Sequence, residues 1–311
     1  WNAESSTAVS VCCSAPAPLT QAEQQTLTAV LDSAFHERKN FVHPLPFNSI
    51  PAELSVSAEN AILIDTATGS ILFEKNADEE VPPASMTKLM VMYIAFKEIA
   101  AGTISMEDIV PLPAECWAKN LPADSSIMFL DQGQKTTLED LLSGLAVASG
   151  NDAAIAIACY ISKNVPAFVE RMNQEAAALG LSHTHFEEPS GYSEKNMTTP
   201  KEFAAFARVY LEKYPEALEK FHSQKSFIYP RSENLPEWHK ENAEQMAVTQ
   251  YNTNKLLDVL QGCDGLKTGF IYESGYNLAL TAKRNGVRFL SVTMHGAGNG
   301  SKEGNYYRIQ D

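Results

Sequence analysis

No run of eighteen apolar residues occurs in this sequence of 311 residues, so no segment is long enough to cross a bilayer as a single helix. The two longest apolar stretches, LMVMYIAF and AAIAIACYI, are typical of buried helices. With 44% hydrophobic residues the chain has enough apolar side chains for a sizeable core, in one large domain or two modest ones.

Basic side chains are also scarce. The sequence has 24 Lys and Arg against 38 Asp and Glu, which leaves 14 net negative charges. Such a surface repels phosphate backbones and anionic lipid headgroups alike. The balance therefore argues against a nucleic-acid partner.

Cysteine is rare and its spacing is uninformative. The five cysteines include the adjacent pair Cys12 and Cys13, and none of them forms a CxxC motif. No metal site is predicted from this pattern. The chain also lacks internal repeats and low-complexity tracts, which excludes a solenoid or a repeat array.

The first 55 residues are predicted to be an N-terminal extension. The chain opens with Trp1 instead of methionine, which suggests that an upstream piece, for example a secretory leader, has been removed. Residues 1 to 18 are small, polar and proline-bearing, as in disordered segments. Thr20 and Glu23 then form a capping box, which predicts a helix within about residues 20–40.

Strand patterns flank a helical middle region. The stretch NAILIDTATGSILFEKNAD from residue 60 predicts a hairpin, and GYNLALTAKRNGVRFLSVTMHG predicts another around its RNG turn. Helical patterns dominate between 84 and 180. We therefore predict an α+β fold in which an antiparallel sheet is closed by both ends of the chain.

The stretch PPASMTK places a serine and a lysine three positions apart. Two prolines precede a helix that is expected to begin at about Ala84, so Ser85 and Lys88 share one face. Serine is a poor nucleophile until a neighbour takes its proton, and a lysine amine does so only when its pKa is lowered, for example by desolvation in the apolar run that follows. The alternative is a surface lysine beside an N-terminal serine. Ser85 is the only serine with lysine at the third position after it.

Two further polar elements follow. Two apolar helical patterns meet at Ser149-Gly150-Asn151, where an inter-helix turn would project both polar side chains or serve only as a turn. A rival triplet, Ser162-Lys163-Asn164, is interpreted as helix capping. Lys267-Thr268-Gly269 precedes a strand-like run, in which glycine allows close approach of a ligand or another backbone, unless the segment is a turn with a solvated lysine.

The order SxxK, SxN, KTG, with intervals of 64 and 118 residues, resembles the penicillin-binding protein and serine β-lactamase superfamily. ASMTKLM, ASGNDAAIAIA, NTNKLL and DGLKTGF resemble more narrowly the low-molecular-mass D-alanyl-D-alanine carboxypeptidases, from about residue 58 to 304. The resemblance implies a DD-peptidase/β-lactamase-like fold, with a five-stranded antiparallel sheet flanked by helices. The catalytic domain would span residues 56–311, with an inserted helical subdomain at about 100–205. Members commonly add a β-rich C-terminal domain and a membrane anchor, so we expect that this chain is a shortened form.

The resemblance also assigns roles to the motifs. It implies that Ser85 attacks the terminal D-Ala-D-Ala peptide bond, that Lys88 takes the serine proton, and that Ser149, bridged to Lys88 and Lys267, passes a proton to the leaving amine. Asn151 would orient Lys88 and the substrate amide. The resemblance further implies that the cation of Lys267 keeps Lys88 neutral. Lys267, the Thr268 hydroxyl and the close-approach position Gly269 would bind the substrate carboxylate. The backbone N–H groups of Ser85 and Phe270 would form an oxyanion hole.

Other implications concern ligands and location. Peptidoglycan pentapeptide stems would be the substrate and β-lactams acylating inhibitors, with no metal or organic cofactor. The protein would act outside the cytoplasm, in the periplasm or at the outer face of the cytoplasmic membrane. It would contact that membrane only through the family's anchor, which we do not expect in this chain. Many relatives carry a polar pair after KTG, whereas Phe270 and Ile271 stand here. The residue that holds the carboxylate is left open between Lys302 and Arg308.

Two alternative functions remain. A class A β-lactamase needs a glutamate for deacylation about 36 residues beyond its second motif, and neither Glu170, only 21 residues past Ser149 and paired with Asn173, nor Glu187 fits that spacing. The other alternative is a penicillin-binding sensor that has lost turnover. The intact motif set favours a carboxypeptidase over both.

Overall fold

A computed structural model describes residues 42–45 and 54–311, which belong to one unit, Val42–Asp311. The predicted helix at 20–40, and most of the predicted extension of residues 1–55, lie outside the described residues. A boundary between extension and catalytic domain near residue 55 stays a prediction.

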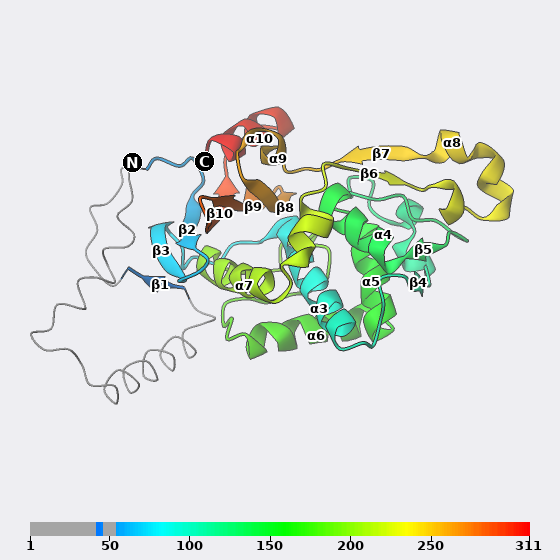
Figure 1. Cartoon of the computed structure of the whole chain (residues 1–311), viewed down its shortest axis with the longest axis horizontal. Helices are drawn as coiled ribbons and strands as arrows, with labels where there is room; N and C mark the ends of the chain where they lie inside the picture. Colours follow the sequence, from blue (N-terminus) through cyan, green and yellow to red (C-terminus); the bar gives the residue numbers. More distant parts are fainter. Residues whose placement is uncertain (1–41, 46–53) are drawn as a thin grey trace, which may run out of the picture. The chain divides into compact units, whose positions relative to one another are not determined.

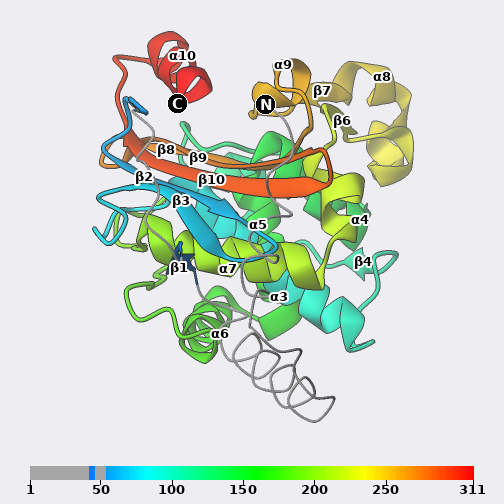
Figure 2. The same ribbon diagram turned by 60° about the vertical axis from the view of Figure 1, so that its left-hand side comes forward.

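A central sheet organises this unit (Figures 1 and 2). Its strand order is β1-β3-β2-β10-β9-β8, and the last five strands pair with one another in antiparallel fashion, as the sequence predicted. The strands are β1 (His43–Pro44), β2 (Asn60–Asp65), β3 (Ser70–Lys75), β8 (Cys263–Ile271), β9 (Gly275–Arg284) and β10 (Val287–Gly296). The predicted count of five is corrected to six, because β1 pairs with β3 in parallel.

Both predicted hairpins are confirmed. The hairpin of β2 and β3 turns through Gly69, which has φ +79°, and that of β9 and β10 turns through Asn285 and Gly286, both with positive φ. An Asn-Gly turn of this kind matches the twist of the two strands that it joins. Strand β10 also pairs with β2, for example Leu290 with Ile64, so the sheet is closed by segments from both ends of the described chain.

Helices and short strands fill the chain between β3 and β8. The helices are α3 (Lys88–Ala100), α4 (Leu138–Ser143), α5 (Asn151–Ser162), α6 (Val165–Ala178), α7 (Pro200–Lys213), α8 (Ala243–Met246) and α9 (Leu256–Val259). The π-helical segments are η4 (Gly144–Ala148) and η5 (Leu218–His222), and the 3₁₀ turns are η1 (Ala84–Thr87), η2 (Ala114–Cys116), η3 (Ala118–Asn120), η6 (Ser232–Asn234) and η7 (Glu237–Asn242). Two small antiparallel pairs are β4 (Ile109–Val110) with β5 (Thr136–Thr137) and β6 (Ser226–Tyr229) with β7 (Val248–Tyr251).

The helices lie on both faces of the sheet. Figures 1 and 2 show α7 and α3 on one face and α10 (Ser301–Gln310) on the other. The α+β class predicted from the sequence is confirmed by this arrangement. The proposed helical subdomain at 100–205 contains α4, α5 and α6 with β4 and β5, and its separation from the rest stays a prediction.

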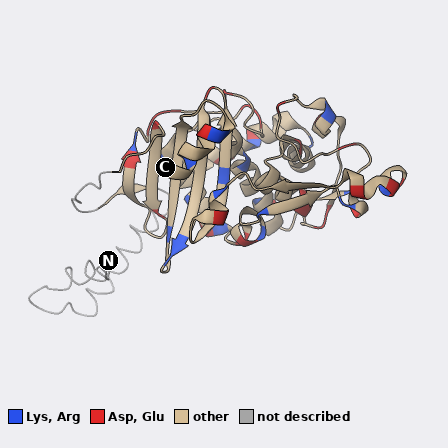
Figure 3. Cartoon of the chain, turned by 90° about the horizontal axis from the view of Figure 1, so that it is seen from above, with Lys and Arg blue, Asp and Glu red and all other residues tan. Residues whose placement is uncertain are grey.

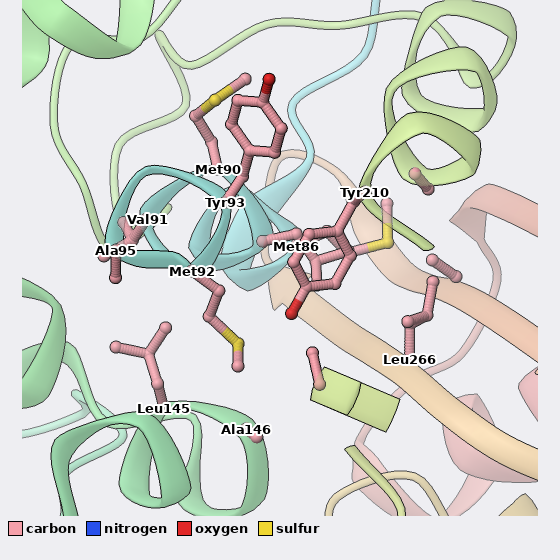
Figure 4. Packing of buried hydrophobic residues seen from close by; sticks show 14 of the residues in the cluster. Met86, Met90, Val91, Met92, Tyr93, Ala95, Leu145, Ala146, Tyr210 and Leu266 are labelled. Carbon is pink, nitrogen blue, oxygen red and sulfur yellow. The ribbon is translucent and has the colours of Figure 1, made fainter. Parts of the chain in front are cut away.

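Helix α3 is the centre of the core. All of its residues from Lys88 to Phe96 are buried, which explains why this segment is apolar on every side instead of along one stripe. Figure 4 shows Met92 directed toward Leu145 and Ala146 of η4. The ring of Phe96 packs against Tyr210 of α7 and Phe221 of η5, with ring centroids 6.3 Å and 5.9 Å apart. The one charged side chain within this buried run is Lys88.

Candidate active site

Ser85 lies on a 3₁₀ turn, η1, that leads directly into α3. A helical segment therefore begins at Ala84 as predicted, although the α-helix proper starts at Lys88. Because a 3₁₀ helix has three residues per turn, positions i and i+3 lie one above the other, and the two side chains project from the same side. Ser85 is only partly buried, while Ala84, Met86 and Thr87 around it are buried.

The Lys88 side chain is fully buried and makes three contacts. Its Nζ lies 2.9 Å from Ser85 Oγ, 2.8 Å from Asn151 Oδ1 and 2.5 Å from the Ser190 carbonyl oxygen. Burial lowers the pKa of Lys88 to about 7, although the negative charges of Glu188 and Asp152 oppose that shift. Near neutral pH, a large share of this amine is therefore uncharged, as a proton acceptor requires.

The Ser149-Gly150-Asn151 turn joins η4 to α5. Ser149 adopts the left-handed conformation, with φ 59° and ψ 34°, and Asn151 is the first residue of α5. Both side chains are buried. Ser149 contacts Lys267 and Asn151 contacts Lys88, so both side chains are directed into the site. In the rival triplet, Lys163 ends α5 and Asn164 accepts a hydrogen bond from Ala167 N at 2.8 Å, which confirms the capping interpretation.

Lys267 lies inside strand β8 and not before it. Its Nζ donates to Ser149 Oγ at 2.9 Å and to the Thr268 carbonyl at 3.0 Å. Burial, followed by the positive charges of Lys88 and Arg308, holds the pKa of Lys267 well below its ordinary value.

Two details of the expected lysine arrangement are corrected. Ser149 contacts Lys267 and is not among the hydrogen-bond partners of Lys88, whose Nζ lies against Ser85, Asn151 and Ser190. Burial is the main cause of the lowered Lys88 pKa, as the apolar run after Lys88 predicted, whereas the Lys267 charge that the resemblance invoked is not among the causes.

Two glycines allow the chain to close around the Ser85 turn. A Cβ at Gly269 would lie 2.6 Å from the Pro83 carbonyl oxygen, and a Cβ at Gly191 would lie 1.8 Å from that of Ala84. Gly191 also has φ +78°, which side chains disfavour. The close backbone approach predicted for Gly269 is thus confirmed, with β8 on one side of the Ser85 turn and the loop around Gly191 on the other.

Two cavities meet at Ser85. The larger, of about 670 Å³, is also lined by Ser149, Thr268, Gly269 and Arg308. The smaller, of about 340 Å³, extends past Asn151, and Ser85 and Phe270 line both. Lys302, the alternative to Arg308, lines a separate surface hollow with its own neighbours on α10.

Two residues near the site, Asp152 and Thr253, were given no role in the sequence analysis. Asp152 is fully buried and accepts hydrogen bonds from the backbone N–H groups of Met128, Leu130 and Ala153, at 2.9 to 3.0 Å. In the sequence it is indistinguishable from an ordinary first-turn helix residue. Thr253 lines the larger cavity, and Thr268 Oγ1 donates to its hydroxyl at 2.7 Å.

Neither a metal cluster nor a membrane span is evident in the described residues. Among them, no group of three or more His, Cys, Asp or Glu side chains is arranged to hold a metal ion. No single described helix has the length and hydropathy needed to cross a membrane; α5 and α6 meet both criteria only as a pair, and this pair is bent by 86°.

Comparisons with known proteins agree on one family. The family model for D-alanyl-D-alanine carboxypeptidases, peptidase S11, matches residues 48–298. D-alanyl-D-alanine carboxypeptidase DacF of Bacillus subtilis is 34% identical over 241 residues, which cover 78% of this chain and 58% of that protein. The chain thus spans less than two thirds of the length of this curated relative.

Solved structures show the same fold. Penicillin-binding protein 6B of Escherichia coli is 34% identical and superposes with a TM-score of 0.74, covering 87% of this chain and 80% of that one. Penicillin-binding protein D2 of Listeria monocytogenes, solved in an ampicillin-bound form, is 26% identical with a TM-score of 0.67, covering 83% of this chain and 96% of that one.

Proposed function

Because this chain belongs to the D-alanyl-D-alanine carboxypeptidase family, we propose that it is a serine carboxypeptidase that removes the terminal D-alanine from peptidoglycan stem peptides. The observation that carries this proposal is the contact of 2.9 Å between Ser85 Oγ and the buried amine of Lys88. A nucleophile activated by an adjacent base is the arrangement that acyl transfer requires.

In the proposed acylation step, neutral Lys88 takes the Ser85 proton while Oγ attacks the carbonyl carbon between the two D-alanines. The C–N bond breaks, and the leaving amine receives a proton from Ser149, which is replenished through its contact with Lys267. Asn151 holds Lys88 at 2.8 Å and orients the substrate amide. Water then attacks the ester: its hydroxyl bonds to the acyl carbon while its proton passes through Ser149 to Lys267. The C–Oγ bond breaks as Lys88 returns its proton to Ser85 Oγ, which restores the starting state.

The oxyanion of the tetrahedral intermediate is stabilised by the backbone N–H groups of Ser85 and Phe270. Support comes from the close approach of β8 to the Ser85 turn, because a Cβ at Gly269 would lie 3.3 Å from Ser85 N. A donor aimed at the developing charge contributes about 3 kcal/mol in other enzymes. Backbone donation survives the replacement of the usual polar pair by Phe270 and Ile271.

Arg308 is favoured over Lys302 as the residue that binds the terminal carboxylate. Arg308 lines the same cavity as Ser85 and Thr268, whereas Lys302 does not. Burial lowers the pKa of Arg308 to about 10, which leaves the group charged at neutral pH. The Thr268 hydroxyl and Lys267 complete the polar wall against which the carboxylate is held.

β-Lactams are proposed to acylate Ser85 and to form an acyl-enzyme that is hydrolysed slowly. The relative from Listeria was solved with ampicillin bound. The candidate deacylation residues Glu170 and Glu187 line neither of the cavities that contain Ser85, and Asn173 is engaged with the backbone of Phe186. This favours a carboxypeptidase over a β-lactamase. Since stem peptides lie outside the cytoplasmic membrane, the proposed place of action is extracytoplasmic.

The test is D-alanine release from diacetyl-L-Lys-D-Ala-D-Ala, together with labelling by fluorescent penicillin. Ser85→Ala is expected to abolish both, whereas Ser232→Ala, an exposed serine on η6, retains both. Labelling that persists in Ser85→Ala would require another nucleophile. Labelling without release by the folded wild-type protein indicates a sensor, and rapid multiple turnover of benzylpenicillin indicates a β-lactamase.

A further inference from the structure

The loop between α6 and α7 carries a half-buried carboxylate, Glu188, that pairs with no cation. Charged side chains of both signs are interspersed over the chain (Figure 3), and several carboxylates pair with a cation, as Asp258 does with Lys225 at 2.9 Å. Glu188 differs, because among the described residues it forms no ion pair and all of its hydrogen-bond partners are neutral. Its negative charge is therefore available to act on other groups.

Both carboxylate oxygens of Glu188 are bound by donors of its own loop. Oε2 accepts from the backbone N–H and the hydroxyl of Ser190, at 2.7 and 2.6 Å. Oε1 accepts from the backbone N–H of Gly191 at 2.5 Å and from Asn196 Nδ2 at 3.1 Å. Asn196 is buried and also donates to Thr87 Oγ1 on η1, at 3.2 Å. An amide has only one acceptor oxygen, so only a carboxylate satisfies both sets of donors.

The loop that Glu188 holds in this way lies directly against Lys88 and the Ser85 turn. The Ser190 carbonyl oxygen is 2.5 Å from Lys88 Nζ. Gly191 fits so closely against the turn that a Cβ there would lie 2.8 Å from Ser85 N. The position of the base relative to the nucleophile therefore depends on the conformation that Glu188 maintains.

The charges that face Lys88 come from three elements. Burial lowers the pKa of Lys88 to about 7, and the carboxylates of Glu188 and, second, Asp152 of α5 oppose that shift. The facing cations are Lys267 of β8 and, acting on Lys267, Arg308 of α10. The three groups in hydrogen-bond contact with the Lys88 amine are neutral. Among the facing carboxylates, Glu188 thus has the largest effect on this amine.

We propose that Glu188 is a positioning residue for Lys88: its carboxylate holds the loop whose Ser190 carbonyl contacts the amine, and its charge favours the ammonium group that forms when the amine takes a proton. The inference rests on the proposed function, in which Lys88 is the base. Glu188 lines neither of the cavities that contain Ser85, so it acts through Lys88 and not on the reacting carbonyl. A buried ammonium group is costly without a negative charge nearby, so loss of the carboxylate makes Lys88 a weaker base.

The experiment removes the charge of Glu188 and records two pH profiles, one for D-alanine release from diacetyl-L-Lys-D-Ala-D-Ala and one for acylation by fluorescent penicillin. In Glu188→Gln the protonated form of Lys88 loses a favourable charge, so its pKa falls. The midpoint of both profiles should therefore move from about 7 to lower pH, by about 1 pH unit, the lower end of the range for a nearby opposite charge. The plateau above the midpoint should fall by about 10- to 100-fold, because the loop no longer fixes the amine.

A matched pair of shorter side chains separates the charge from the shape. Glu188→Asp and Glu188→Asn differ only in charge, and the midpoint should stay close to 7 in the first variant and move to lower pH in the second. The control is Glu187→Gln, because this neighbouring carboxylate is exposed and pairs with His185 Nε2 at 3.0 Å. Both profiles of the control should match those of the wild type. Thermal unfolding of each variant checks that the fold is retained.

The outcomes separate this inference from the function on which it rests. A lower plateau with an unchanged midpoint in both amide variants indicates a purely structural role and overturns the proposal, as does a midpoint that rises or no change at all. Failure of both amide variants to fold also overturns it, because Glu188 is then needed for the fold itself. If the folded wild-type protein is acylated by penicillin but releases no D-alanine, the carboxypeptidase function is wrong, and the acylation profile still tests Glu188. Absence of both reactions overturns both.

Discussion

Lys88, at the bottom of the cleft, is fully buried and contacts three partners, whereas Glu273, at its edge, is exposed and has no hydrogen-bond partner among the described residues. The same contrast holds for the groups around them. We call the buried set the floor and the exposed set the rim. The floor consists of Lys88, Ser149, Asn151 and Lys267, and the rim of Asp124, Tyr192, Glu194, Tyr272 and Glu273.

The difference between the two sets follows from the work proposed for each. Proton transfer requires a base whose pKa is lowered and whose position is fixed, and only burial among helices and strands supplies both. Contact with the parts of the substrate beyond the scissile bond requires surface area, which exposed loops supply without rigid geometry. Substitutions of floor residues should therefore lower kcat strongly, and substitutions of rim residues should raise KM only slightly.

The largest effect is expected for the base itself. Lys88→Met preserves length and apolar packing but removes the amine, and D-alanine release should fall by about 10²- to 10⁴-fold, the range for loss of general base catalysis. Lys97→Met on the same helix, whose side chain is 47% exposed, is the matched control and should retain release.

The pH dependence tests the same residue without mutation. Because the Lys88 pKa is about 7 and only the uncharged amine accepts a proton, kcat/KM should rise with pH through about 7 and level off above it. Below that midpoint, the rate should fall about tenfold for each pH unit, as expected for one ionisation. A profile that is flat, or that decreases from pH 6 to 8, would contradict the role of Lys88.

An intermediate effect is expected at Arg308, the residue proposed to bind the terminal carboxylate. Arg308→Gln removes the charge that lines the larger cavity, and kcat/KM should fall by about 10- to 100-fold, because a hydrogen bond to a charged group contributes about 1.5 to 3 kcal/mol. Lys302→Gln, on the same helix but facing the separate hollow, should change kcat/KM by less than about twofold, as surface substitutions usually do. The reverse ranking would assign the carboxylate to Lys302.

The smallest effect is expected on the rim. Tyr192→Phe removes the hydroxyl that donates to Asp124 at 3.0 Å and leaves the ring in place. Since this bond is exposed to solvent, kcat/KM for diacetyl-L-Lys-D-Ala-D-Ala should change by no more than about threefold, with kcat unaffected. A loss of a hundredfold in kcat would instead place Tyr192 with the floor and remove the distinction between the two sets.

The sequence predicted the elements of the site better than their surroundings. The spacing of Ser85 and Lys88 and the Asn285-Gly286 turn depend on local backbone geometry, so both were predictable from a few residues. The sixth strand was not, because two residues from the N-terminal side meet β3 without a strand pattern of their own. Asp152 was missed for a similar reason, since two of its three backbone partners, Met128 and Leu130, lie more than twenty residues away.

By itself, the sequence determined which groups are available and which of them are close through local geometry, above all the Ser85 hydroxyl and the Lys88 amine on one turn. Tertiary structure alone decided which distant groups join them. Ser149 meets Lys267 across 118 residues, Lys88 contacts the Ser190 carbonyl across 102, and Arg308 rather than Lys302 faces the larger cavity. The physical reason is that a pKa and an electric field depend on everything packed around a group, and that packing is a property of the whole fold.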